Sequence, residues 1–187
     1  MRVLLIDFYD SFTYNLAHYL EALDVELTVR RYDNLQDLVL HDFDAFILSP
    51  GPGLPREKEG LFDFLRQFVG QRPILGVCLG MQAIAEYLGA TLSNQQKVKH
   101  GVAEKIDIRS HGGLFRSLSS QIEVGLYHSW KVQCPEQWVS AKSETGVVMA
   151  IERPELKVYG VQFHPESVMT PMGKEILRNF IQIVQHG

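Results

Sequence analysis

The segment that most constrains this chain lies at residues 73–88, where an apolar run passes a cysteine directly into a helical pattern. Residues 73–77 (PILGV) have the composition of a buried strand, and residues 81–88 (MQAIAEYL) continue as a helix. A strand that feeds a helix at once forces the turn residue, Cys78, into a strained backbone and requires small neighbours. The pattern Gly76-Val77-Cys78-Leu79-Gly80 therefore predicts a nucleophile elbow with cysteine in place of serine.

In such an elbow the sulfur of Cys78 lies over the first turn of the helix, where free N–H groups and the helix dipole favour a thiolate. The same residues also suit a structural cysteine buried at a strand end, because free cysteine is among the most buried residue types. A cysteine nucleophile needs a base and a group that orients the base. The remaining motifs decide between the two interpretations.

The first half of the chain alternates strand and helix patterns. Apolar or alternating runs predict strands at residues 3–6, 25–29 and 45–48, and helical spacing predicts helices at 12–23, 33–40 and 61–68. Asp10 or Ser11 is expected to cap the first helix, and Gly70 to end the third. Repeated units of this kind predict an open, mostly parallel sheet with helices on both faces.

The second half is expected to add further β structure to this α/β fold. Short alternating stretches predict strands at residues 104–108, 122–126, 139–141, 147–151 and 158–161. Thr170-Pro171 is expected to open a last helix, whose apolar face is formed by Ile176, Leu177, Phe180, Ile183 and Val184. Because no Pro/Ser-rich linker separates the halves, residues 1–187 are predicted to form a single domain.

Composition excludes several classes of protein. The 187 residues are 45% hydrophobic and carry a net charge of −4 without a basic run, so a nucleic-acid partner is not expected. No apolar run approaches the about 20 residues of a membrane span, and the N-terminus has the pattern of a strand, not of a signal peptide. With Cys78 and Cys134 as its only cysteines, the chain has no disulfide scaffold, which favours a reducing, cytoplasmic setting.

The sequence predicts neither a metal nor a cofactor. Its histidines lack the spacing of metal ligands, and no glycine-rich nucleotide-binding loop is present. Cys134 stands before Pro135 without a companion motif and is interpreted as structural.

A candidate base follows the strand predicted at residues 158–161, in the run 162–167 (QFHPES). Pro165 fixes its own φ and restricts His164, so His164 and Glu166 are held in an extended turn. Glu166 would then fix the imidazole tautomer while His164 takes the thiol proton, as in a Ser-His-Asp triad. The alternative interpretation of residues 162–167 is a solvated surface turn.

Residues 50–53 (PGPG) follow the strand predicted at 45–48. They should lie at the same edge of the sheet as the elbow, where ligands of open α/β sheets bind. Glycine lets backbone N–H groups approach a ligand closely, and with the N–H of Leu79 they could form an oxyanion hole. An ordinary Pro/Gly turn is the alternative.

Together these motifs resemble those of the class I (triad) glutamine amidotransferases. The Gly-x-Cys-x-Gly elbow of that family matches residues 76–80, its His-x-Glu pair matches residues 164–166, and its glutamine four residues after the cysteine matches Gln82. Within the family the chain is most similar to the glutaminase subunits of anthranilate synthase and aminodeoxychorismate synthase. The matching segments are 10–15 (DSFTYN), 48–53 (LSPGPG), 100–101 (HG), 127–129 (YHS) and 160–167 (GVQFHPES).

The resemblance implies a role for each matched residue. Cys78 would attack the side-chain amide of glutamine, His164 would act as base and then as acid, and Glu166 would orient His164. The N–H groups of Gly51 and Leu79 would form the oxyanion hole. The implied glutamine pocket consists of Gly51, Gly53, Gln82, Ser129 and Trp130.

The resemblance also implies partners: L-glutamine as substrate, and a chorismate-utilising synthase subunit (component I) that receives the ammonia. The chain departs from the subfamily pattern at Phe8, Met81, Trp130 and residues 102–104 (VAE). At Met81 the chemistry is expected to be unaffected. Trp130 is expected to alter the pocket wall, and the other departures would change details of partner contacts.

Two other classes of function compete with this interpretation. One is a stand-alone cysteine hydrolase of γ-glutamyl or peptide substrates, against which the PGPG loop and Gln82 argue. The other is a non-catalytic regulatory subunit, against which the intact Cys78, His164 and Glu166 argue.

Overall fold

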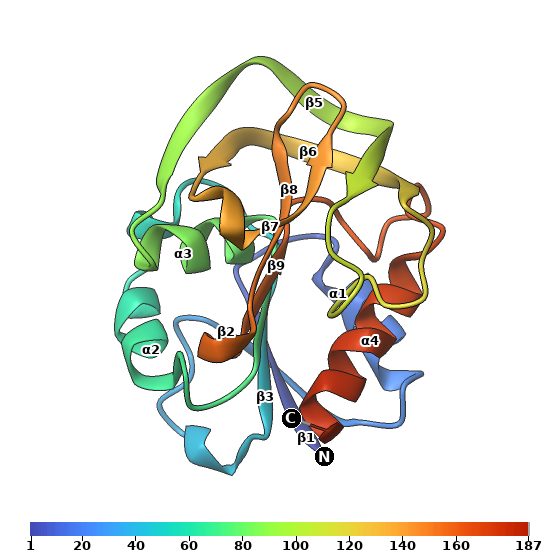
Figure 1. The fold of residues 1–187 in the computed structure, drawn as a ribbon. Helices are drawn as coiled ribbons and strands as arrows, with labels where there is room; N and C mark the ends of the chain where they lie inside the picture. The colour runs from blue at the N-terminus through green and yellow to red at the C-terminus, as the bar shows by residue number, and fades with distance from the viewer. Residues whose placement is uncertain (187) are drawn as a thin grey trace.

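A computed structural model of the chain describes residues 1–186, except for the side chains of residues 96–99. Its core is a nine-stranded sheet in the order β2-β1-β3-β4-β9-β8-β7-β5-β6 (Figure 1). The parallel part contains β2 (Glu26–Arg31), β1 (Arg2–Asp7), β3 (Ala45–Leu48), β4 (Ile74–Val77) and β9 (Val158–Val161). The antiparallel part contains β8 (Val148–Arg153), β7 (Val139–Ser143), β5 (Thr91–Ile108) and β6 (Gln121–Gln133).

Helices cover both faces of the parallel strands. Helices α1 (Thr13–Glu21) and α4 (Gly173–His186) lie on one face, and α2 (Leu61–Phe68) and α3 (Leu79–Tyr87) on the other (Figure 1). Successive strand residues point to opposite faces, so Val3 and Leu5 join the core under α1 and α4, while Leu4 and Ile6 join the core under α2 and α3. The predicted α/β fold, with added β structure in the second half, is confirmed.

The predicted helix at residues 33–40 is wrong. This segment forms turns, and a short 3₁₀ helix follows at Leu40–Asp42. Gln36 donates its side-chain amide to the carbonyl of Asp33 (3.0 Å), while Leu35 and Leu38 pack against the core under α2 and α3. Polar side chains that bond to the nearby backbone compete with a helix, and here the turns still bury the leucines.

Two helix starts also differ from expectation. Neither Asp10 nor Ser11 caps α1, whose N-cap is Phe12 without a side-chain cap bond; Asp10 instead accepts the N–H of Phe12 (2.8 Å) in a turn before the helix. The last helix begins at Gly173, not at Thr170-Pro171. Thr170 is held elsewhere, because its hydroxyl donates to the carbonyl of His164 (2.7 Å).

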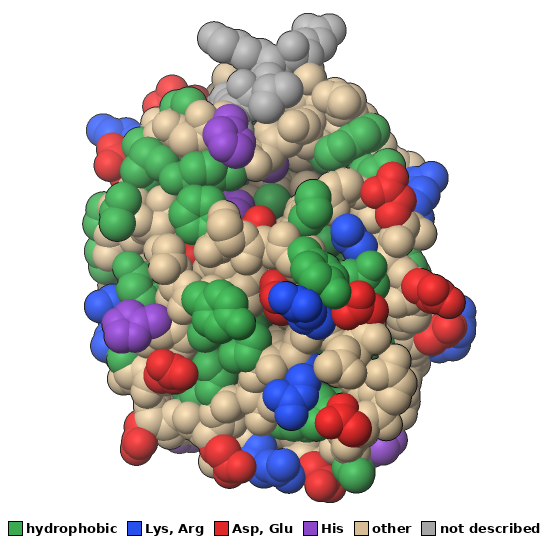
Figure 2. Space-filling view, turned by 180° about the vertical axis from the view of Figure 1, so that it is seen from behind, with side chains coloured by type: hydrophobic (Ala, Val, Ile, Leu, Met, Phe, Trp, Pro, Cys, Tyr) green, Lys and Arg blue, Asp and Glu red, His purple; other side chains and the backbone are tan. Residues whose placement is uncertain are grey.

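Among the described residues, no helix is both long and apolar enough to cross a bilayer. On the face drawn in Figure 2, the described Lys and Arg side chains are interspersed with Asp and Glu and do not gather into a basic patch.

A buried carboxylate lies at the far end of β8 from the sheet edge that carries Cys78. Glu152 pairs with Tyr159 of β9, and a Cβ on Gly113 would stand 1.8 Å from Glu152 Oε2, so the loop before Leu114 is closed tightly over the carboxylate. Burial raises the pKa of Glu152 to about 7, although the Ser140 side chain and the Leu114 backbone partly lower it.

Glu152→Gln should remove a pH-dependent cost of folding. Since the folded pKa of about 7 lies above the ordinary 4.5, the wild type loses stability as pH rises from 4.5 to 7. Urea denaturation should show the variant more stable than wild type by about 1–3 kcal/mol at pH 8 and equal to it near pH 4.5. The exposed Glu144→Gln is the matched control. Parallel stability curves for Glu152→Gln and wild type would contradict the expectation.

Candidate active site

The predicted elbow is present between β4 and α3. Cys78 has φ 52° and ψ −103°, a conformation that L-residues rarely adopt. Its N–H donates to the carbonyl of Val161 (2.8 Å), and its own carbonyl accepts the N–H of Gln82 (3.1 Å), which opens α3. The turn is thus pinned on one side to β9 and on the other to the helix, and Cys78 is buried.

The two flanking glycines of the elbow are required by close backbone packing. A Cβ on Gly76 would stand 2.3 Å from the backbone of Gly80, and a Cβ on Gly80 would stand 2.4 Å from the carbonyl oxygen of Leu48. Side chains at these positions would push α3 away from β4 and β3. The two glycines of the Gly-x-Cys-x-Gly pattern are therefore needed because the helix lies so close to the sheet.

Gly80→Ala should destabilise the fold by about 1–3 kcal/mol, the usual cost of overpacking a closed interior. Gly112→Ala is the matched control, because its Cβ would meet nothing nearer than 3.9 Å. Urea denaturation should place the control within about 0.5 kcal/mol of wild type. Equal stability of the two variants would show that the close approach of α3 is not required.

His164 and Glu166 form a buried pair in the turn that follows β9. The imidazole Nδ1 of His164 lies 2.6 Å from Glu166 Oε1. The backbone of His164 is fixed as well, since its N–H donates to the carbonyl of Gly125 in β6 (3.1 Å) and its carbonyl accepts the Thr170 hydroxyl. The rings of Phe12 and Tyr127 flank the imidazole, with centroids 5.4 and 4.9 Å away.

The electrostatic setting of His164 favours the imidazolium. Burial alone lowers the pKa of His164, but hydrogen bonding and Coulombic attraction to Cys78 and Glu166 overcome this and raise the pKa to about 10. Since Nδ1 of the ring bonds to Glu166, Nε2 is the nitrogen left to take a proton from the sulfur. A proton taken from the sulfur would be held stably on His164.

Glu166→Gln should lower the pKa of His164 by at least about one unit, because it removes a charged hydrogen-bond acceptor. NMR titration of ¹⁵N-labelled histidine gives the measurement, and in wild type the His164 signal should stay in its protonated form through neutral pH. The signal of the exposed His111 supplies the internal control. An unchanged His164 titration in the variant would contradict the assigned electrostatics.

The PGPG loop lies against the elbow. A Cβ on Gly51 would stand 2.6 Å from Phe8 Cβ and 2.9 Å from Leu79 Cδ2, so this loop contacts the first residue of α3. The Ser49 hydroxyl accepts the N–H of Phe8 (2.9 Å). Gly53 has φ 77°, in the left-handed region that favours glycine.

A pocket of about 200 Å³ opens beside the sulfur of Cys78. It brings together the five residues that the resemblance assigned to the glutamine pocket: Gly51, Gly53, Gln82, Ser129 and Trp130. Leu79, assigned to the oxyanion hole through its N–H, is not among the lining residues and is buried in the first turn of α3. His164 and Glu166 are also not among the lining residues.

Three residues at this site received no role from sequence reasoning. Tyr127 and His128 line the pocket, and His128 Nδ1 donates to the carbonyl of Trp130 (2.8 Å). Gln162, fully buried, places its Nε2 3.5 Å from Cys78 Sγ. The sequence signal for Gln162 is a polar residue directly after a buried strand. The sequence does not show which strand lies beside that one, so it could not predict the contact with Cys78.

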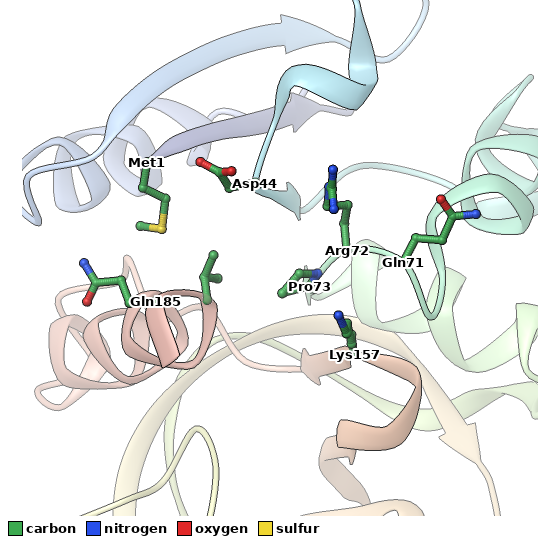
Figure 3. A pocket seen from close by; sticks show the side chains of 8 residues that line it. Met1, Asp44, Gln71, Arg72, Pro73, Lys157 and Gln185 are labelled. Carbon is green, nitrogen blue, oxygen red and sulfur yellow. The ribbon is translucent and has the colours of Figure 1, made fainter. Parts of the chain in front are cut away.

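A second hollow, of about 390 Å³, lies at the opposite end of the parallel strands (Figure 3). It is lined by Met1, Asp44, Gln71, Arg72, Pro73, Lys157, Val184 and Gln185. It includes none of the predicted site residues and lacks a nucleophile with an adjacent base among its lining side chains.

Comparison with known proteins agrees with the fold. The family model "Glutamine amidotransferase class-I" matches residues 4–184. The chain therefore belongs to the class-I glutamine amidotransferase family.

Within this family, the chain is similar to component 2 proteins of anthranilate and aminodeoxychorismate synthases. The chain is 41% identical to the aminodeoxychorismate/anthranilate synthase component 2 of Bacillus subtilis, over 96% of this chain and 95% of that protein. It is 39% identical to the anthranilate synthase component 2 of Lactococcus lactis, over 99% and 96% of the two chains. A glutamine amidotransferase structure from Thermotoga maritima has the same fold, with a TM-score of 0.79, 16% identity, and coverage of 100% and 99%.

Proposed function

We propose that this chain hydrolyses L-glutamine and delivers the ammonia to a chorismate-aminating synthase subunit, component I of anthranilate synthase, of aminodeoxychorismate synthase, or of both. The observation that carries the proposal is the meeting, at one sheet edge, of the Cys78 elbow, the His164–Glu166 pair and a small pocket. Component 2 proteins of both synthases are similar to this chain over nearly its whole length.

The first half-reaction follows from the arrangement of the three side chains. Cys78 Sγ attacks the side-chain amide carbon of glutamine, and its proton passes to His164, which Glu166 holds in orientation. The N–H groups of Gly51 and Leu79 stabilise the oxyanion of the tetrahedral intermediate. His164 then gives its proton to the departing nitrogen, so that ammonia leaves and a glutamyl thioester remains.

In the second half-reaction water attacks the thioester. His164 removes a proton from that water, the bond between carbon and sulfur breaks, and glutamate is released with Cys78 restored. The protons move among Cys78, His164, the substrate and water, so the proposed cycle balances without a cofactor.

The size of the pocket favours a free amino acid over a peptide. About 200 Å³ is below the roughly 300–1,000 Å³ of pockets that hold drug-sized ligands. Its walls are the PGPG loop on one side and residues of β6 on the other, with Gln82 and Cys78 between them. This favours glutamine hydrolysis over cleavage of peptides, and the His164–Glu166 pair argues against a purely regulatory subunit.

Cys78→Ala should abolish glutamine hydrolysis, with a loss of at least about 1,000-fold, because the nucleophile is gone. In the reconstituted complex with component I, synthesis from chorismate and glutamine should be lost while synthesis from chorismate and ammonium salts should remain. The measurements are glutamate release and product formation by each synthase.

Matched assays with γ-glutamyl peptides separate the competing functions. Wild-type cleavage of peptides without hydrolysis of glutamine would identify a stand-alone hydrolase. Persistence of glutamine-dependent synthesis in Cys78→Ala would show that Cys78 is not the nucleophile.

A further inference from the structure

Two glutamine side chains form a chain of hydrogen bonds that ends on the reactive sulfur. Gln162 Nε2 donates to Cys78 Sγ (3.5 Å), and Gln82 Nε2 donates to Gln162 Oε1 (3.1 Å). Gln162 is fully buried and Gln82 nearly so, which removes competition from water for either contact.

This chain of bonds has only one polarity that suits a thiolate. If the Gln162 amide were turned over, its oxygen would face the sulfur and its NH₂ group would face the NH₂ group of Gln82. Both contacts of this reversed amide are unfavourable. The amide oxygen would be repelled by an anionic sulfur, and the two NH₂ groups would face each other without an acceptor. The Nε2 donor of Gln82 therefore holds the Oε1 atom of Gln162, and this leaves the Nε2 group of Gln162 directed at Cys78.

The pairing of the strands explains why Gln162 reaches the sulfur. Val77 of β4 is paired with Val161 of β9, so the residues that follow, Cys78 and Gln162, leave the sheet side by side. His164, two residues further on, is close enough for Cys78 to contribute to its raised pKa. The amide donor that contacts Cys78 and the proposed base thus come from one short segment.

We propose that Gln162 is a catalytic residue, which stabilises the Cys78 thiolate by N–H donation, and that Gln82 is the positioning residue that orients it. The inference rests on the proposed glutaminase function and adds to it a second group on the reacting atom. Gln82 also lines the substrate pocket, so the side chain that contacts substrate is the one that aims Gln162.

The competing explanation is that Gln162 only fills space at the end of β9. The two explanations differ in their effect on ionisation of the sulfur. The titratable groups around Cys78 are His164, with Glu166 behind it, and Tyr127 and His128 across the pocket. Substituting Gln162 leaves all of these in place, so a shift in thiolate formation would report on the lost amide.

The experiment measures the rate of Cys78 alkylation by iodoacetamide against pH, without substrate, in Gln162→Met and wild type. Methionine has a similar length but no N–H donor. The midpoint of the acid limb should rise by about one pH unit, because a hydrogen bond to the charged form is lost. Glutaminase kcat should fall about 10- to 100-fold, as expected for one hydrogen bond to a charged group, with KM essentially unchanged.

The second cysteine does not obscure this measurement. Burial, with a further contribution from Glu136, raises the pKa of Cys134 to about 11, so alkylation near neutral pH reports on Cys78. A Cys134→Ser background removes the remaining reaction. Gln185→Met, at an exposed position in α4, is the matched control and should leave both midpoint and kcat unchanged.

The coupling between the glutamines is tested with Gln82→Met and the double variant. Gln82→Met should shift the alkylation midpoint in the same direction by less than Gln162→Met does, and the double variant should shift it no further than Gln162→Met. Additive shifts would overturn the positioning role of Gln82.

An unchanged midpoint in a folded Gln162→Met protein, or a change in KM alone, would overturn the role of Gln162. If Gln162→Met does not fold, Gln162→Glu is used instead; a carboxylate beside the sulfur should raise the midpoint further, and an unchanged midpoint again overturns the inference. If the wild type fails to hydrolyse glutamine, the proposed function falls, while the alkylation midpoint still decides whether Gln162 stabilises the thiolate.

Discussion

The close approach of α3 to the sheet is the constraint on which the site depends. Gly76 and Gly80 leave no room for side chains between the helix and strands β3 and β4, so the chain must turn within one residue. That residue, Cys78, takes up the strain with a positive φ. A small shift of the helix would relax the turn and would also withdraw the sulfur from its neighbours on β9.

The other half of the catalytic apparatus depends on the neighbouring strand. Because β4 and β9 are parallel and in register, the carboxyl end of β9 delivers Gln162 and His164 beside Cys78. The turn after β9 is rigid, since Thr170 and Gly125 hold the backbone of His164 and Glu166 holds its ring. Strands β4 and β9 are far apart in the sequence but adjacent in the sheet, so residues that follow them come into contact. Open parallel sheets assemble sites from distant segments in this way.

Much of this could be predicted from the sequence. The strands of the parallel half are buried on both faces, so β1, β3, β4 and β9 appear as continuous apolar runs. The glycines of the elbow could be predicted because a turn from a strand directly into a helix requires small residues on either side of it. The helix expected at residues 33–40 does not form, although the leucines there have helical spacing, because the Gln36 side chain bonds to the nearby backbone carbonyl of Asp33 and the segment forms turns. The contact of Gln162 with Cys78 depends on the order of strands in the sheet, which no local pattern encodes.

Strand β6 carries two parts of the site at once. The carbonyl of Gly125 receives the N–H of His164, and the residues from Tyr127 to Trp130 form a wall of the pocket. A Cβ at Gly125 would stand 2.8 Å from Ser167 Oγ, so the turn that bears the base lies directly on this strand. Slippage of β6 by one residue would turn the pocket wall inside out and release the base in the same movement. The register of a single strand therefore sets the specificity and the reactivity of the site together, and neither can change by such a movement while the other stays fixed.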